Sequence, residues 1–263
     1  MEILIAFFLG VVQGLTEFLP VSSSGHLELA KAIFSSDFTA KESMMMTVVL
    51  HFATALSTMV VFRKDIGKIL VGIFSSVDVS QRIFSLKIII SMIPAAIVGV
   101  LWDDLIEELF NGQLLLVGGM LLVTAFLLFM ADRAKPTNLK LSFKNSFIIG
   151  IAQSIAILPG ISRSGATIAT SVLLGIDKES AAKFSFLMVV PLIFGKIFKD
   201  IIDGALFVEN LNILALLIGF TAAFLTGLFA CKWMIKLVKS SQLKYFSFYC
   251  LIVALITILF VTI

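Results

Sequence analysis

Charged side chains are scarce in this sequence: Asp, Glu, Lys and Arg make up 14% of the 263 residues, whereas soluble domains carry about 25%. Hydrophobic residues reach 59% and the mean hydropathy is +1.09. Cysteine occurs only as Cys231 and Cys250, both inside apolar segments, so neither a disulfide framework nor a cysteine metal site is indicated. A net charge of +3 is too small to indicate a nucleic-acid partner. We therefore expect residues 1–263 to form a single membrane domain surrounded by lipid.

The apolar segments fall into two kinds. Six segments can span a membrane as single helices of about 20 residues, alone or with their flanks: 44–62, 86–101, 113–131, 184–198, 210–231 and 245–263. Two pairs, 3–19 with 24–36 and 145–158 with 164–176, are interrupted by Pro, Gly and Ser. Interrupted backbone at membrane depth is tolerated only where protein buries it or where it lines a wet cavity. We predict an all-α polytopic protein with about six spanning helices and two re-entrant helix hairpins.

The distribution of charge predicts the topology. Lys and Arg gather in three stretches, 63–87, 132–144 and 232–244, whereas 102–111 has neither and holds four acidic residues. The positive-inside rule places the three basic stretches in the cytoplasm and the acidic one outside. This is self-consistent only if each hairpin returns to its own side, the first from outside and the second from the cytoplasm. That arrangement is an inverted-topology repeat, with 1–131 as the first repeat and 132–263 as the second.

The two interrupted pairs also resemble each other in sequence. "GVVQGLTEFLPVSSSG" (10–25) aligns with "GIAQSIAILPGISRSG" (150–165). The identical positions are Gly10, Gln13, Ser22, Ser24 and Gly25 against Gly150, Gln153, Ser162, Ser164 and Gly165. Duplicated, interrupted and oppositely oriented elements usually meet near the bilayer centre and build a binding site there.

Each interruption ends at a Ser-x-Ser-Gly stretch where a new helix is expected to begin. A helix N-terminus has unpaired N–H groups and a positive dipole end, so it attracts anions and phosphate above all. Arg163 lies at the second of these ends, and its planar guanidinium suits phosphate oxygens. The expected phosphate ligands are Ser22, Ser24, Gly25, Ser162, Ser164, Gly165 and Thr167.

The same stretches hold candidate catalytic residues. Ser23 is a candidate nucleophile, and His26 follows it by three residues, within reach as an acid or base. Glu17 lies one helical turn after Gln13, so both side chains face the same way. A carboxylate beside a phosphate site indicates a divalent cation between them, Mg²⁺ or Ca²⁺, held by Glu17 and Gln13. In the alternative interpretation, Arg163 merely pairs with Glu17 to lower the cost of burying both, and the serines bond backbone carbonyls.

"QGLTEFLPVSSSGH" (13–26) and "LPGISRSGAT" (158–167) resemble the undecaprenyl-diphosphate phosphatase family, the bacitracin-resistance phosphatases of bacterial membranes. "FSFLMVVP" (184–191) also resembles the family. The resemblance implies hydrolysis of a long polyprenyl diphosphate to its monophosphate plus inorganic phosphate, which recycles the lipid carrier of cell-wall synthesis. It further implies a divalent metal and a site that opens to the outer face of the cytoplasmic (inner) membrane. A homodimer is compatible with the sequence.

The family motifs are carried over residue by residue. They fall on Gln13 and Glu17 (acidic motif), on Ser22, Ser23 and His26 (serine-histidine motif) and on Arg163. The family has Glu or Gln at the first of these positions. Here Gln13 removes one candidate carboxylate and offers only its carbonyl oxygen.

Two alternatives stay open at this point. The attacking group is either Ser23 assisted by His26, or a water positioned by His26 and the metal. A secondary transporter or polyprenyl-phosphate flippase would have the same broken helices and inverted repeat, but phosphate binding alone does not need a nucleophile beside a base. A purely structural membrane subunit would leave Glu17 and Arg163 unexplained, because ionisable residues in apolar segments are costly.

His51, in the apolar run "VVLHFATAL", is expected to be structural or pore-facing.

Overall fold

Helices form all the regular secondary structure in the part of the chain that the structure describes. The computed structural model describes residues 2–34, 40–74, 78–110, 112–135, 137, 139–202, 212–239 and 242–262. The helices are α1 (Glu2–Thr16), α2 (Ser23–Ile33), α3 (Ala40–Val61), α4 (Arg63–Phe74), α5 (Val79–Leu101), α6 (Asp103–Leu109), α7 (Leu114–Asp132), α8 (Phe143–Ile155), α9 (Arg163–Leu173), α10 (Lys178–Ile202), α11 (Ile213–Lys239) and α12 (Leu243–Thr262). The all-α class is therefore confirmed.

Six of these helices, α3, α5, α7, α10, α11 and α12, are long and apolar enough to cross a membrane. They coincide with the six predicted spans, and the protein is a polytopic membrane protein. Helices extend through most of two of the three basic stretches. The stretch 63–87 contains α4 and the start of α5, and α11 continues to Lys239 through most of the stretch 232–244. Lys and Arg do not end these helices, because both residues have good helix propensity.

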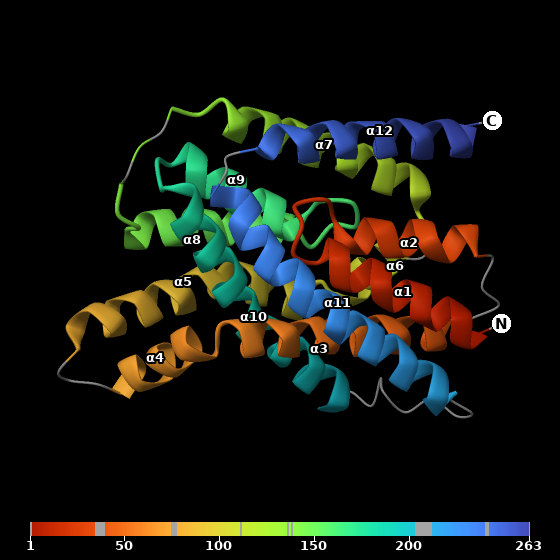
Figure 1. Cartoon of the computed structure of the whole chain (residues 1–263), viewed down its shortest axis with the longest axis horizontal. Coiled ribbons are helices and arrows are strands. Elements are labelled where there is room, and N and C mark those ends of the chain that lie inside the picture. Colours follow the sequence, from red (N-terminus) through yellow and green to blue (C-terminus); the bar gives the residue numbers. More distant parts are fainter. Residues whose placement is uncertain are drawn as a thin grey trace.

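The two interrupted pairs fold as helix–loop–helix units whose loops meet in the middle of the molecule (Figure 1). The first unit, α1 and α2, opens toward the right-hand side of Figure 1, and the second, α8 and α9, opens toward the left. The loops touch, because the Ser164 hydroxyl donates a 3.1 Å hydrogen bond to the Leu19 carbonyl. This is the arrangement expected of two oppositely oriented hairpins. Their re-entrant character in a bilayer, and the repeat boundaries, stay predictions.

Each hairpin packs against a long helix from the other half of the chain. Gly10 lies against α11, where an added Cβ would collide with the Gly219 carbonyl oxygen, and Gly150 lies against α5, where it would collide with the Ser91 carbonyl oxygen. These two glycines are aligned in the predicted repeat. Small residues at both positions let the backbones approach closely, which is how helices associate in lipid.

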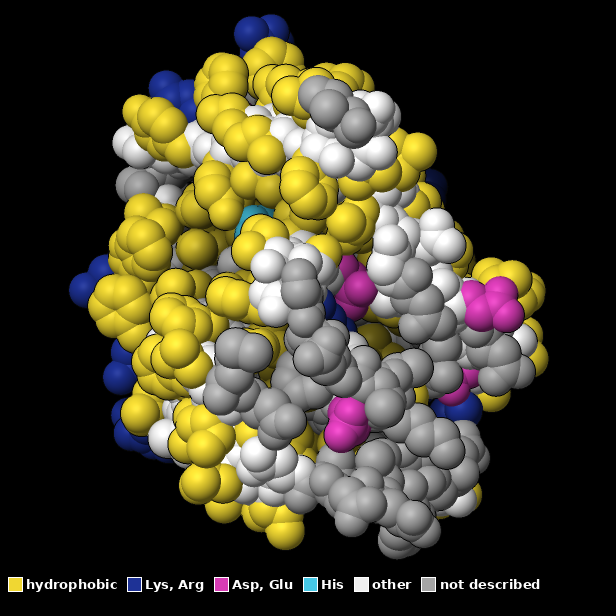
Figure 2. Space-filling view, turned by 90° about the vertical axis from the view of Figure 1, so that its right-hand side faces the viewer, with side chains coloured by type: hydrophobic (Ala, Val, Ile, Leu, Met, Phe, Trp, Pro, Cys, Tyr) yellow, Lys and Arg dark blue, Asp and Glu magenta, His cyan; other side chains and the backbone are white. Residues whose placement is uncertain are grey.

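The two ends of the molecule differ in charge. The C-terminal ends of α4, α7 and α11 and the N-terminal ends of α5, α8 and α12 lie toward the left of Figure 1, and the Lys and Arg residues of the three basic stretches lie in or beside these helices. Figure 2 views the opposite end, where carboxylates are visible on the face and most visible Lys and Arg side chains lie near its margin. The orientation in the bilayer, with the basic end in the cytoplasm, stays a prediction.

Candidate active site

Both new helices begin where the Ser-x-Ser-Gly stretches predict. Ser22 caps α2 by accepting a 3.2 Å hydrogen bond from the Gly25 N–H, and Ser162 caps α9 by accepting a 3.0 Å bond from the Gly165 N–H. Ser22 has a φ of 71°, which is uncommon for a residue other than glycine. The predicted N-termini are therefore confirmed, and they place Ser23 and Arg163 as the first residues of their helices.

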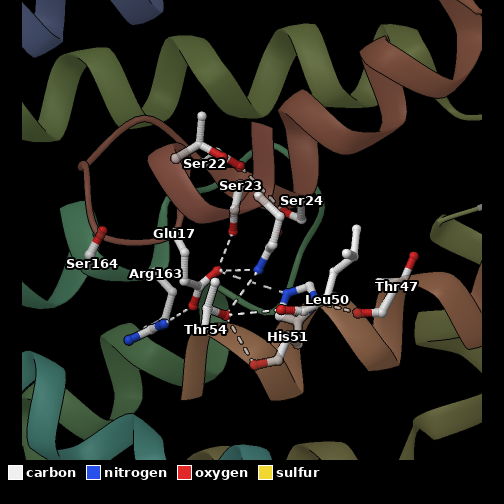
Figure 3. A network of polar contacts seen from close by, with 12 residues as sticks. Glu17, Ser22, Ser23, Ser24, Thr47, Leu50, His51, Thr54, Arg163 and Ser164 are labelled. Atoms are coloured by element: carbon white, nitrogen blue, oxygen red, sulfur yellow. Dashed lines mark hydrogen bonds and ion pairs between the residues drawn. The ribbon is translucent and has the colours of Figure 1, made fainter. Parts of the chain in front are cut away.

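Glu17 is the centre of a polar cluster built from both hairpins and α3 (Figure 3). Its side chain is only 6% exposed and pairs through Oε1 with Arg163 Nη2. Its other oxygen, Oε2, accepts a 2.6 Å hydrogen bond from the Ser23 hydroxyl and a 3.0 Å bond from Gln13 Nε2. Gln13 Nε2 also lies 3.4 Å from the Thr54 hydroxyl of α3. The carboxylate is thus surrounded by donors, as a buried charge requires.

Two polar atoms of this cluster have no hydrogen-bond partner among the described residues. They are Arg163 Nη1 and Gln13 Oε1, and both are buried. An unsatisfied buried polar group costs roughly 1–3 kcal/mol. A guanidinium N–H and an amide oxygen left open beside a serine–carboxylate pair indicate a site prepared for a polar ligand.

A cavity of about 180 Å³ lies next to these groups. Its polar wall is formed by Glu17, Ser23, Ser24, His51 and Arg163. Its apolar wall comes from the second hairpin loop and α10, with Ala156, Ile157, Ile161, Val189 and Ile193. A ligand with a charged head and an apolar tail would find both kinds of surface here.

Most of the predicted phosphate ligands have other hydrogen-bond partners. Of the seven, Ser24 lines the cavity. Ser22 and Ser162 cap their helices, Ser164 joins the hairpin loops, and the Thr167 hydroxyl donates to the Arg163 carbonyl at 2.8 Å. In the structure these groups therefore build the two loop tips that hold Ser23 and Arg163 in place.

His26 does not contact Ser23 through a hydrogen bond in the described structure. Its Nδ1 lies 2.7 Å from the Ser22 carbonyl oxygen, and its Nε2 lies 2.8 Å from the hydroxyl of Tyr249 in α12. The two rings are stacked. Both ring nitrogens are therefore engaged, and the partner of the Ser23 hydroxyl is Glu17 and not His26. The role of His26 as an acid or base stays a prediction.

His51, for which the sequence left a structural and a pore-facing position open, lines the cavity. It comes from α3, and its Nε2 lies 3.9 Å from Glu17 Oε2. The available signal was the one that identified Glu17, namely an ionisable residue in an apolar segment. Thr47 precedes it and Thr54 follows it at helical spacing, which marks a polar face on α3.

The described residues contain no cluster of three His, Cys, Asp or Glu side chains that could hold a metal by itself. Glu17 supplies the one carboxylate of the cavity lining, and the unpartnered Gln13 Oε1 lies beside it. Mg²⁺ is commonly held by one or two carboxylates together with substrate phosphates. The donor set therefore fits a cation shared with a phosphorylated ligand, and not a site made by the protein alone.

Together the fold and the site define a multi-pass membrane protein with a serine, a carboxylate and an arginine gathered in one cavity inside its helix bundle. The family model described as "Bacitracin resistance protein BacA" matches residues 6–256, and the chain belongs to this family. The undecaprenyl-diphosphatase of Christiangramia forsetii is 60% identical over 260 residues, covering 99% of this chain and 98% of that protein. Those of Bacteroides fragilis and Halothermothrix orenii are 48% and 38% identical, each with 98% of both chains covered.

Proposed function

We propose that this protein is an undecaprenyl-diphosphatase, which hydrolyses undecaprenyl or a related polyprenyl diphosphate to the monophosphate and inorganic phosphate. The observation that carries the proposal is the unpartnered Nη1 of Arg163 beside the Ser23–Glu17 hydrogen bond. It supplies a charged donor for phosphate next to a hydroxyl already bonded to a base. The reaction would recycle the lipid carrier of cell-wall synthesis and so confer bacitracin resistance.

In the first step, the Ser23 oxygen attacks the terminal phosphorus of the diphosphate. A Ser–O–P bond forms, the bridging P–O bond breaks, and the polyprenyl monophosphate leaves. Glu17 Oε2, 2.6 Å from the hydroxyl, takes the serine proton. Arg163 and the N-terminus of α2 stabilise the charge on the phosphoryl oxygens, which supplies most of the rate in phosphoryl transfer.

In the second step, water attacks the phosphoserine. The Ser–O–P bond breaks, inorganic phosphate is released, and Glu17 returns its proton to the Ser23 oxygen. The carboxylate thus acts first as a base and then as an acid, as microscopic reversibility requires for a group that serves both steps.

A divalent cation, Mg²⁺ or Ca²⁺, fits beside Glu17 and Gln13 and would neutralise phosphate charge when bound. Loss of phosphate release on addition of chelator, restored by added Mg²⁺ or Ca²⁺, tests this requirement. An undiminished rate after exhaustive chelation would contradict it.

The substrate's position follows from the two walls of the cavity. The diphosphate head lies against the polar wall, and the isoprenoid tail extends along apolar residues such as Val189 and Ile193 of α10 toward the lipid. We propose that the site opens to the outer face of the bacterial cytoplasmic membrane. Association into a homodimer stays a prediction, which a mass measurement of the detergent-solubilised protein would test.

The function is tested by phosphate release from farnesyl and longer polyprenyl diphosphates. The purified protein in detergent, without a membrane gradient, should release phosphate, whereas a transporter or flippase alone would release none. Ser23→Ala and Glu17→Gln should abolish release. Ser154→Ala is the matched control, because Ser154 lies outside the cavity lining and its hydroxyl donates to the Ile151 carbonyl, and it should retain most of the activity. Retained activity in Ser23→Ala would exclude the serine nucleophile.

A further inference from the structure

The orientation of His51 is fixed by one hydrogen bond to the backbone. Its Nδ1 lies 2.8 Å from the Thr47 carbonyl oxygen, one turn earlier in α3. A carbonyl oxygen can only accept, so Nδ1 carries a proton, and in the neutral imidazole Nε2 is then left with its lone pair. The ring is thereby held in one tautomer, with its basic nitrogen on the side of Glu17 (Figure 3).

The basic nitrogen of His51 is available to a molecule in the cavity. Nε2 is 3.9 Å from Glu17 Oε2, which is longer than a hydrogen bond. The side chain is 28% exposed, whereas that of Glu17 is 6% exposed, and His51 lines the cavity together with Ser23 and Arg163. A water in this cavity would therefore be within reach of the imidazole.

The second step of the proposed reaction needs a base other than Glu17. After the first step Glu17 holds the proton of Ser23, and it must keep this proton until the serine oxygen leaves. The other titratable side chains in the described lining of the cavity are Arg163 and His51. Arginine remains protonated in proteins and cannot accept a proton. His51 is the group that remains.

We propose, on the basis of the proposed function, that His51 is the general base for hydrolysis of the phosphoserine. Nε2 takes a proton from water as the water oxygen bonds to phosphorus. The bond between phosphorus and the Ser23 oxygen breaks, and Glu17 protonates that oxygen. Inorganic phosphate leaves, and the imidazolium returns its proton to solvent. Each half of the reaction then has its own base, Glu17 for the serine and His51 for the water.

Trapping of the covalent intermediate tests this assignment. The protein in detergent is mixed with a polyprenyl diphosphate labelled at its terminal phosphate, quenched with acid, and analysed for label bound to Ser23. His51→Gln should accumulate about one labelled phosphate per protein, and its steady-state release should fall by about 10²–10⁴-fold, the usual effect of removing a general base. Thr58→Ala is the matched control, and it should not accumulate label, because Thr58 lies on the same helix outside the cavity lining and its hydroxyl bonds the Thr54 carbonyl.

A second variant guards against a folding defect. His51→Ala leaves space for added imidazole, which should restore phosphate release and discharge the label from Ser23. If His51→Gln releases phosphate at the wild-type rate, or loses activity without any trapped label in either variant, His51 is not this base. Failure of the wild-type protein to release phosphate would instead reject the proposed function itself, so the two failures can be told apart.

Discussion

Replacement of both members of the buried Glu17–Arg163 ion pair should separate folding from catalysis. Glu17 and Arg163 are 6% and 17% exposed, so removal of one partner leaves an uncompensated charge in the bundle. Such a change usually costs 3–5 kcal/mol. We expect the lower end, about 3 kcal/mol, for Glu17→Gln and for Arg163→Met, because the adjoining cavity admits water. In a protein of this size that corresponds to a fall in Tm of about 6–12 °C.

The double variant leaves neither charge unpaired. It should be destabilised by about 3 kcal/mol or less, and not by the sum of about 6 kcal/mol, because residues in direct contact are energetically coupled. Phosphate release, in contrast, should not return. All three variants should lose about 10³-fold or more, the usual effect of removing an arginine that stabilises a phosphoryl transition state.

The measurements are thermal unfolding in detergent and phosphate release from a polyprenyl diphosphate. The Lys183–Asp65 pair is a matched control, because its side chains are 46% and 29% exposed, and surface pairs contribute about 0–1 kcal/mol. Lys183→Met with Asp65→Asn should change neither Tm nor activity appreciably. Additive losses of stability in the Glu17/Arg163 double variant, or near-normal release from Arg163→Met, would refute the assigned roles.

Three further outcomes follow from individual contacts. Gly10→Ala should lower stability by about 1–3 kcal/mol through overpacking against α11. Gly119→Ala is the control, because open space surrounds Gly119, and it should leave stability unchanged. Equal Tm values for the two variants would exclude close packing at Gly10. Tyr249→Phe removes a hydrogen bond to His26 worth about 1 kcal/mol, so Tm should fall by about 2–4 °C. An unchanged Tm would exclude a stabilising contact, and a fall in kcat would indicate that His26 acts in the reaction. Burial raises the pKa of Asp103, but hydrogen bonds from two lysines of α10 outweigh it and hold that pKa below its ordinary value. A carboxyl with a lowered pKa stabilises the fold above about pH 4, and this stabilisation is lost below that pH. Acidification should therefore lower Tm more in the wild type than in Asp103→Asn. If the Tm of both proteins falls in parallel with pH, the ion pair is excluded as a source of stability.

Length and composition were sufficient to predict the spanning helices, because a bilayer of fixed thickness requires long uninterrupted apolar runs. The same criterion cannot detect α4 or α6, which are short helices in charged stretches. The interrupted hairpins were also predictable, since α2 and α9 begin within a residue of the expected positions. Their serines cap the new helices, which is a local effect that a sequence records directly.

The gathering of Glu17, Ser23 and Arg163 was predictable from two local motifs in oppositely oriented hairpins. The partners of the histidines were not. His26 bonds to Tyr249, 223 residues further along the chain, and no motif connects these positions. His51 lies in a regular spanning helix, where the face that meets the hairpin loops depends on the packing of α3 against its neighbours. The spacing of Thr47, His51 and Thr54 marks a polar face on this helix, but it does not identify the segment that this face contacts.

The ion pair between Glu17 and Arg163 joins positions 146 residues apart, which has a consequence for biogenesis. At ribosomal rates of about 5–20 residues per second, the first hairpin, which ends at Ile33, is complete roughly 7–26 s before its arginine has been synthesised. During this interval the carboxylate has no cationic partner from the second half, and hydrocarbon would be a costly environment for it. We therefore expect the N-terminal hairpin to settle at its final depth only after the second half of the chain has inserted, so that the site and the mature topology are completed together.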